Sequence, residues 1–275
     1  MVPVYETLGM DSVEYIMQQI HMKTCICGVN ETMKLLESCS KVRSLKYIIQ
    51  IGEISPEMRQ RAEECKLTII PFDEIEAEGE KHPLPIQPPC GDDVCTICYT
   101  SGTTGQPKGV VITHRNYISS IMATISTGLF PEATDRYLSY LPLAHVLERV
   151  LNYAILSSGG RIGYSQGGTK KIVDDLKALR PTVFCSVPQL LNRVCDMIKA
   201  EMEKKGVLIN TLFHWGMASK QYRVMHRLDK HHWFFDPFLF DAIRRSAGLD
   251  CVRITVCGSA PLSNEVKRDR KSTRL

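Results

Sequence analysis

The sequence lacks an apolar run of about 18 residues, the length that a transmembrane helix requires. It also lacks a secretory signal, because its start, MVPVYETLGMDSVEY, has no basic segment followed by an apolar one. Internal repeats and low-complexity segments are absent as well. We therefore expect an intracellular globular chain with no transmembrane segment in these residues.

An excess of charge of one sign is absent from most of the chain. The formal net charge is +4, and segment 267–275 alone holds five basic residues and one acid, so residues 1–266 are formally neutral. Proteins that bind nucleic acid carry a basic face or stripe. No nucleic-acid partner is therefore expected, and 267–275 is interpreted as a solvated basic tail of unclear origin.

The eleven cysteines are odd in number and scattered through apolar segments. We interpret them as reduced, buried small side chains. Cys95 and Cys98 have the C-x-x-C spacing of many metal and redox sites, but they lie in VCTICY, which has the composition of a strand. Positions three apart in a strand face opposite sides, so the sequence predicts no metal ligand there.

Short apolar runs alternate with helical segments through the first 80 residues. Strands are expected at 24–28 (TCICG), 45–51 (LKYIIQI) and 66–72 (KLTIIPF). Asp11 is expected to cap the first helix, and Ser55 to cap another that has Pro56 in its first turn. Continuous apolar strands of this length suit a parallel sheet covered on both faces by helices. The fold class predicted is α/β, followed by an extended proline-rich connector at 82–89.

The alternation of strands and helices resumes after the connector. Strands are expected at 92–100, 109–113, 136–141, 182–187 and 251–258, and helices at 116–126, 144–157, 170–180 and 189–202. Residues 204–248 are predicted to be helical. Their aromatic side chains are expected in the core or lining an apolar pocket: Phe213, Trp215, Trp233, Phe234 and Phe235.

The strongest local signal is the loop in YTSGTTGQPKGV, residues 99–110. Glycines there let the backbone approach a polyanion and adopt positive φ, while hydroxyls and backbone N–H groups donate to phosphate oxygens. Lys108 adds a positive charge, and Pro107 stiffens the loop before it. The spacing is not that of a Walker A loop, G-x-x-x-x-G-K-[ST], and composition alone leaves a simple turn open.

The complete string resembles the phosphate-binding signature of the adenylate-forming superfamily, which includes acyl-CoA synthetases, luciferases and peptide-synthetase adenylation domains. The resemblance implies that this loop binds the β- and γ-phosphates of ATP. The residues that it assigns to phosphate are Thr100, Ser101, Gly102, Thr103, Thr104, Gly105 and Lys108.

A second segment, SYLPLAHVLER at 139–149, narrows the choice. His145 lies near the start of a predicted helix, and Glu148 and Arg149 follow one turn later, so the three are expected on one helix face. A histidine at a helix start can be purely structural. The segment nevertheless resembles the second block of eukaryotic-type long-chain acyl-CoA synthetases, which implies that His145 is a catalytic residue beside the carboxylate and α-phosphate.

The resemblance extends over residues 1–266, through RPTVFCSVPQLLNRV at 180–194 to GSAPLS at 258–263. It implies that the last turn packs against adenine through Gly258, Ser259, Ala260 and Pro261. The implied reaction activates a long-chain fatty acid with ATP, Mg²⁺ and CoA through an acyl-adenylate. The complete enzyme is expected at a membrane surface, that of the endoplasmic reticulum, the outer mitochondrial membrane or the peroxisome.

Several parts of the superfamily pattern do not occur in the chain. These are the Tyr-Gly-x-Thr-Glu motif, the aspartate that holds ribose, and the C-terminal domain with its adenylating lysine. We therefore expect residues 1–266 to be a partial N-terminal AMP-binding domain without the C-terminal domain, with negligible ligase activity alone. Two alternatives stay open: a CoA ligase for another class of acid, and a non-catalytic, truncated nucleotide-binding fragment.

Overall fold

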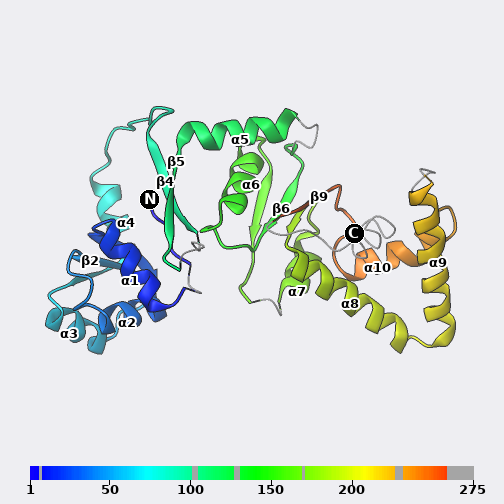
Figure 1. The fold of residues 1–275 in the computed structure, drawn as a ribbon, viewed down its shortest axis with the longest axis horizontal. Coiled ribbons are helices and arrows are strands. Elements are labelled where there is room, and N and C mark those ends of the chain that lie inside the picture. Colours follow the sequence, from blue (N-terminus) through cyan, green and yellow to red (C-terminus); the bar gives the residue numbers. More distant parts are fainter. Residues whose placement is uncertain (6–7, 101–104, 127–130, 169–170, 227–231, 259–275) are drawn as a thin grey trace. The chain divides into compact units, whose positions relative to one another are not determined.

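A computed structural model describes the chain except residues 6–7, 101–104, 127–130, 169–170, 227–231 and 259–275 (Figure 1). The chain forms two compact units, Met1–Tyr117 and Ile118–Leu275. Helix α5, His114–Ser126, crosses the boundary between them. Each unit has its own sheet and its own apolar core.

The first unit contains a three-stranded parallel sheet in the order β1-β2-β3. Its strands are β1 Thr24–Gly28, β2 Tyr47–Ile51 and β3 Thr68–Pro71. Its helices are α1 Met10–Gln19, α2 Val29–Glu37, α3 Pro56–Glu64 and α4 Phe72–Lys81. Apolar side chains of α1, α2, α3 and β2 form one core, which includes Met17, Leu36, Ile48 and Met58. The predicted parallel α/β arrangement is confirmed here.

Two helix starts in this unit show how caps can be predicted from sequence. Ser55 caps α3 as expected, because its side chain accepts a hydrogen bond of 3.2 Å from Met58 N. The prediction that Asp11 caps α1 is wrong: the N-cap is Gly9, and Asp11 lies inside the first turn. A carboxylate there still favours the helix through the positive end of its dipole.

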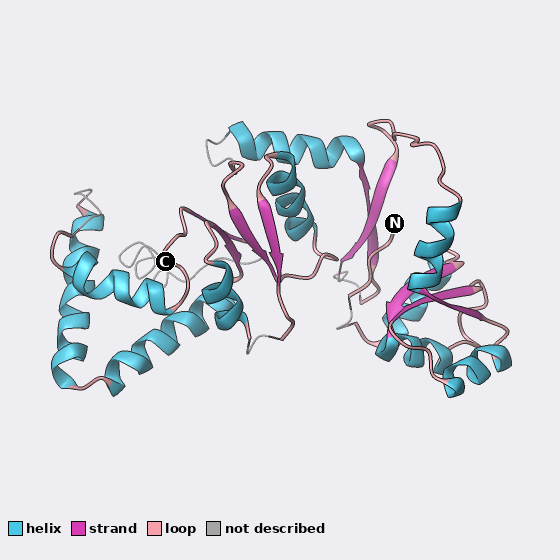
Figure 2. Ribbon diagram, turned by 180° about the vertical axis from the view of Figure 1, so that it is seen from behind, coloured by secondary structure: helices cyan, strands magenta, loops and turns pink. Residues whose placement is uncertain are grey.

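The strands that flank the glycine-rich loop form a separate antiparallel pair, β4 Val94–Thr100 and β5 Lys108–Thr113 (Figure 2). The loop between them is too short for a parallel crossover, which needs a dozen residues or more. The prediction of parallel sheets therefore does not extend to this pair. The proline-rich segment 82–89 before it forms neither helix nor strand, as expected.

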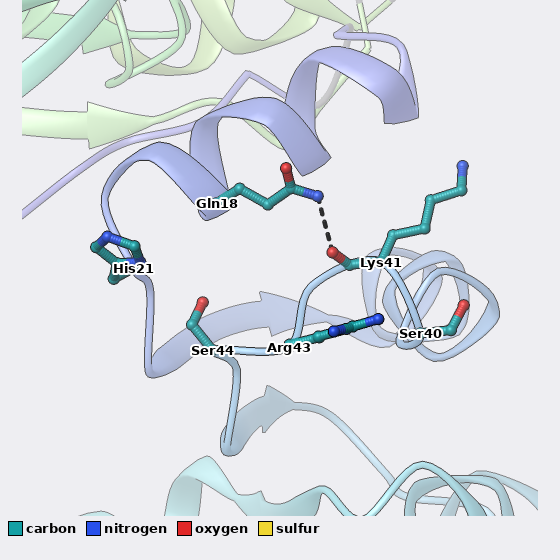
Figure 3. Close-up of a pocket in the computed structure, with 6 residues that line it drawn as sticks. All are labelled: Gln18, His21, Ser40, Lys41, Arg43 and Ser44. Carbon is teal, nitrogen blue, oxygen red and sulfur yellow. Dashed lines mark hydrogen bonds between the residues drawn. The ribbon is translucent and has the colours of Figure 1, made fainter.

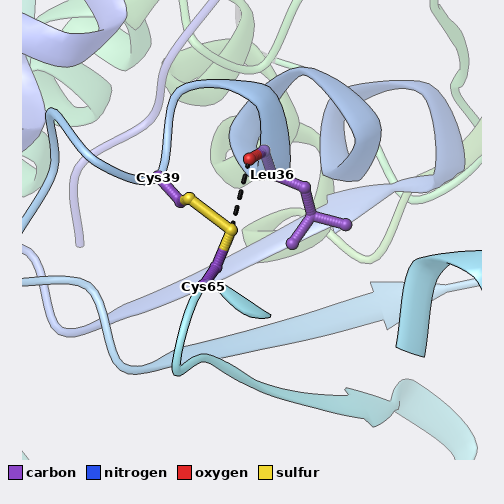
Figure 4. The surroundings of a disulfide bond; sticks show 3 residues. All are labelled: Leu36, Cys39 and Cys65. Carbon is purple, nitrogen blue, oxygen red and sulfur yellow. Dashed lines mark hydrogen bonds between the residues drawn. A yellow bond between two sulfur atoms is a disulfide. The ribbon is translucent and has the colours of Figure 1, made fainter. Parts of the chain in front are cut away.

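A disulfide joins Cys39, just after α2, to Cys65 at the end of α3 (Figure 4). The prediction that every cysteine is reduced is wrong for this pair, because the parallel sheet brings the ends of two successive helices together. Cys65 Sγ also lies 3.4 Å from Leu36 O, a carbonyl to which only the reduced thiol can donate. Cys95 and Cys98 are free cysteines of β4.

The second unit is built on a four-stranded parallel sheet in the order β7-β6-β8-β9. The strands are β6 Arg136–Ser139, β7 Arg161–Tyr164, β8 Val183–Ser186 and β9 Ile254–Cys257. Tyr137 and Val183 pack on the face covered by α6, Val146–Ser157. Leu138 and Phe184 pack on the other face, against α7, Ile172–Leu179, and α8, Pro188–Lys204. All four residues of β8 are buried and three of them are apolar, which suits a strand covered on both faces.

A polar network closes the amino edge of this sheet. Asp135 precedes β6, Thr182 precedes β8 and Arg253 precedes β9. The buried Asp135 carboxylate accepts hydrogen bonds from Thr182 Oγ1 at 2.5 Å and Arg253 Nε at 2.9 Å. Burial alone would raise the pKa of Asp135, but the hydrogen bonds from Arg253 and Thr182 outweigh it and lower that pKa to about 2.

The remaining described elements of the second unit are helical, as expected for the described part of 204–248. The elements are α7 Ile172–Leu179, α8 Pro188–Lys204, α9 Val207–Met225, a π-helical turn Asp236–Phe240 and α10 Asp241–Ser246. Phe213 and Phe235 are buried in their core, whereas Trp215 and Trp233 are 68% and 78% exposed and so lie outside it. Phe234 and Phe235 line a pocket of about 350 Å³, which agrees with the alternative expectation of pocket lining. Among the helices described, none is long and apolar enough to cross a bilayer.

Candidate adenylation site

The carboxyl edge of the parallel sheet in the second unit gathers two of the segments that the sequence singles out. Strand β6 ends at Ser139 and leads to His145, and β9 ends at Cys257, just before Gly258. Parallel strands end on the same side of a sheet, and ligands of α/β proteins bind at that edge. The Asp135 network lies at the opposite edge of the sheet.

His145 is the N-cap of α6. Its extended backbone precedes the helix, and its Nδ1 accepts a hydrogen bond of 3.2 Å from Leu147 N. Its own N–H donates to Pro142 O at 2.9 Å, which closes the turn between strand and helix. A ring nitrogen that accepts carries no proton, so a neutral His145 holds its hydrogen on Nε2. The ring is thereby oriented, with Nε2–H available as a donor.

Glu148 and Arg149 do not converge with His145 on one open face, although the helical spacing predicts it. Glu148 is fully buried and its carboxylate accepts hydrogen bonds from Tyr137 Oη at 2.5 Å and Ser139 Oγ at 2.6 Å. Arg149 Nε instead donates to Leu143 O at 2.7 Å. The carboxylate of Glu148 points toward the sheet because hydroxyl donors of β6 lie beneath the first turn of α6. Helical periodicity alone does not predict this direction.

Gly258 lies against the same turn of α6. Its N–H donates to Ser186 O at 3.3 Å, which continues the pairing of β8 and β9. A Cβ atom on residue 258 would come within 2.6 Å of Leu147 Cδ2. The absence of a side chain therefore lets the end of β9 approach the helix that His145 caps. Ser259, Ala260 and Pro261 lie outside the described residues.

The glycine-rich loop is held by the β4–β5 pair in the first unit. Thr100 and Lys108 are register partners, so they face each other where the loop leaves and rejoins the strands. Gly105 has φ +90°, a conformation that favours glycine, and Pro107 is buried. Ser101, Gly102, Thr103 and Thr104 lie outside the described residues. The predicted ends of the loop are thus adjacent, both with exposed side chains.

A pocket of about 490 Å³ that is lined by polar and charged residues lies elsewhere in the first unit (Figure 3). Its lining residues are Gln18, His21, Ser40, Lys41, Arg43 and Ser44. Lys41 Nζ lies 3.0 Å from Glu14 Oε2, and Gln18 Nε2 donates to Lys41 O at 2.8 Å. These contacts attach the segment after α2 to α1. Within the described part of the chain, no group of three His, Cys, Asp or Glu side chains could hold a metal.

The chain resembles known proteins along almost its whole length. The family model described as AMP-binding enzyme matches residues 1–273. The chain is 35% identical over 267 residues to peroxisomal long chain acyl-CoA synthetase 7 of Arabidopsis thaliana, covering 96% of this chain and 37% of that protein. It is also 35% identical to long-chain-fatty-acid–CoA ligase 5 of Rattus norvegicus, covering 96% of this chain and 39% of the ligase.

Solved structures show the same fold. The adenylation domain of a carboxylate reductase from Mycobacterium chelonae superposes with a TM-score of 0.77 at 20% identity, over 99% of this chain and 41% of that one. The equivalent domain from Segniliparus rugosus, in complex with AMP and a co-purified carboxylic acid, gives 0.76 at 18% identity, over 100% of this chain and 43% of that one. At these identities the likeness establishes the fold alone, that of an adenylation domain. The chain spans about two fifths of the length of these proteins.

Proposed function

This chain belongs to the AMP-binding enzyme family, and from that membership we propose that it forms part of a ligase that activates long-chain fatty acids. The relatives named as long-chain acyl-CoA synthetases match 96% of the chain. The proposed reaction joins a fatty-acid carboxylate to the α-phosphorus of ATP, with diphosphate leaving. The CoA thiol then displaces AMP and forms the thioester.

The observation that best supports the proposal is the contact between two distant segments at one sheet edge. Gly258 lies against Leu147, two residues after His145, although more than 100 residues separate the segments. In the proposed mechanism the backbone of 258–261 faces adenine, and His145 donates from Nε2–H to the oxygens of the carboxylate and α-phosphate. Fixed donors of this kind stabilise charge that develops in the transition state.

The glycine-rich loop has the other proposed role. Thr100, Gly105 and Lys108, with the residues between them, would bind the β- and γ-phosphates and so orient diphosphate as the leaving group. CoA is the second substrate. Mg²⁺ would arrive bound to the phosphates of ATP.

Association with a membrane surface and a location at the endoplasmic reticulum, outer mitochondrial membrane or peroxisome belong to the same proposal. One relative is named as peroxisomal. A long-chain fatty acid partitions into bilayers, so a ligase that acts on it gains from lying near one. Cell fractionation with the complete gene product would test this part separately.

The function is tested with acyl-adenylate mimics in which a sulfamate replaces the phosphate. Calorimetry of the purified chain should show saturable binding that tightens as the acyl group lengthens from acetyl to hexadecanoyl. Preference for a benzoyl or acetyl mimic would instead favour a CoA ligase for another acid class. Binding of AMP with no contribution from the acyl group would favour a non-catalytic nucleotide-binding fragment. If the chain binds neither AMP nor any of the acyl mimics, the proposal is contradicted.

A further inference from the structure

The buried carboxylate beside the proposed site has no role in the mechanism above. We propose that Glu148 is a positioning residue: it fixes the first turn of α6, and thereby the ring of His145, relative to the carboxyl edge of the sheet. The inference rests on the proposed function for the role of His145. The positioning itself rests on contacts that Glu148 makes within the chain.

Three donors from two elements surround Glu148. Tyr137 and Ser139 are two residues apart in β6, so their side chains lie on one face of the strand, and both hydroxyls donate to the carboxylate, at 2.5 Å and 2.6 Å. Asn152, one turn later in α6, donates from Nδ2 to Oε1 at 3.1 Å. One side chain therefore joins strand β6 to the helix turn that His145 caps.

Arg149 fixes the same turn from the other side. Its Nε donates to Leu143 O at 2.7 Å, within the connection between β6 and α6. The N–H of His145 donates to Pro142 O in that connection, and the His145 ring accepts from Leu147 N. The backbone on both sides of His145 is thus hydrogen-bonded, and Glu148 hydrogen-bonds the turn to strand β6.

Burying the carboxylate of Glu148 at this position carries a desolvation cost. Burial raises the pKa of Glu148, although the hydrogen bonds from Ser139 and Tyr137 act in the opposite direction. An apolar side chain of similar volume would avoid the desolvation cost, but it could not accept bonds from both strand hydroxyls. Directional bonds constrain the helix turn in a way that apolar packing does not, because burial of apolar surface is non-directional.

The nitrogen NMR signals of the His145 ring report whether Nδ1 still accepts its hydrogen bond, and so whether the ring keeps its orientation. In the 275-residue chain, His145 should give one pyridine-like signal for Nδ1 and one pyrrole-like signal for Nε2, assigned by their loss in His145→Ala. Glu148→Ala should move both signals toward a tautomer average. Glu148→Gln, which still accepts through Oε1, should restore most of the separation. Unchanged ring signals in Glu148→Ala would overturn the proposal.

A matched control separates positioning from general stability. Asp135→Asn alters another buried carboxylate of the same unit, but at the opposite edge of the sheet, so it should destabilise the fold and leave the His145 signals in place. An equal shift in both variants would mean that loss of stability alone moves the ring, which contradicts positioning. If Glu148→Ala does not fold, Ser139→Ala removes one donor and permits the same comparison.

Binding of the hexadecanoyl sulfamate mimic distinguishes this inference from the proposed function. If both hold, His145→Ala and Glu148→Ala each weaken binding, and the double variant binds no more weakly than His145→Ala alone. Additive losses would contradict action through His145. If Glu148→Ala shifts the ring signals while His145→Ala leaves binding unchanged, the positioning stands and the proposed role of His145 fails.

Discussion

The buried charge at the amino edge of the second unit's sheet should make a measurable, pH-dependent contribution to stability. Asp135→Asn removes the charge of a carboxylate that is 1% exposed. The pKa of Asp135 is lowered from 3.8 to about 2 in the folded chain. A change of one in a pKa corresponds to about 1.4 kcal/mol, so the charge stabilises the fold by about 2 kcal/mol at neutral pH. Arg253 keeps access to water, so the variant leaves no buried, unpaired cation.

The sign of the pH dependence follows from the direction in which that pKa moves. A carboxylate with a lowered pKa in the folded state contributes stability above its unfolded pKa and loses it as pH falls through the folded value. The difference between wild type and Asp135→Asn should therefore be about 2 kcal/mol at pH 7 and should vanish between about pH 4 and pH 2.

The stability difference is measured by urea unfolding. Pulsed hydrogen exchange of the amides of β6 and β8 monitors the unfolding of the second unit alone. Asp196→Asn is the control in the same unit, because Asp196 is exposed and solvent screens its charge, and it should change unfolding little at any pH. A difference for Asp135→Asn that is as large at about pH 2.5 as at pH 7 would refute the reasoning, since the effect would then not depend on charge.

Three further predictions concern other parts of the chain. Gly248→Ala should destabilise the second unit by at least about 2 kcal/mol in urea unfolding, because its φ is +71° and a Cβ would lie 2.4 Å from the Leu176 backbone. Reducing the Cys39–Cys65 disulfide, whose partners are 26 residues apart, should lower the free energy of unfolding of the first unit by about 3 kcal/mol. Thiol titration of the oxidised chain should find nine thiols. Glu148→Gln should remove a gain in stability that wild type shows as pH falls, because a raised pKa favours the protonated folded state, and unfolding from pH 8 to 4 would measure it.

Much of the fold could be predicted from the sequence because most strands are continuous apolar runs between turn residues. The segment TVFCSV was predicted as a strand, and β8 within it is buried throughout. Strand β7 was missed because Arg161 and Tyr164 are exposed and Gly163 interrupts the apolar pattern. Helix α4 is absent from the prediction because five of its ten residues are acidic and it buries none of its residues.

The candidate site was predictable only as separate segments. Local chemistry identified the loop from Thr100 to Lys108 and the histidine at a helix start, but not which segments meet. The approach of Gly258 to Leu147 depends on the order of β6, β8 and β9 in the sheet, which no local pattern encodes. Likewise, the direction of Glu148 depends on Tyr137 and the strand that lies beneath its helix turn.

Asp135 and Glu148, two of the buried carboxylates of the second unit, show why its sheet edges differ in kind. Asp135 has a cationic partner, which lowers its pKa, so its charge stabilises the fold at neutral pH. The hydroxyl and amide donors that surround Glu148 are neutral, and burial raises its pKa, so its charge carries a cost there. A costly buried group next to a proposed catalytic histidine is expected where geometry matters more than stability. Substitutions at the amino edge should therefore act through the amount of folded protein, and those at Glu148 through the site itself.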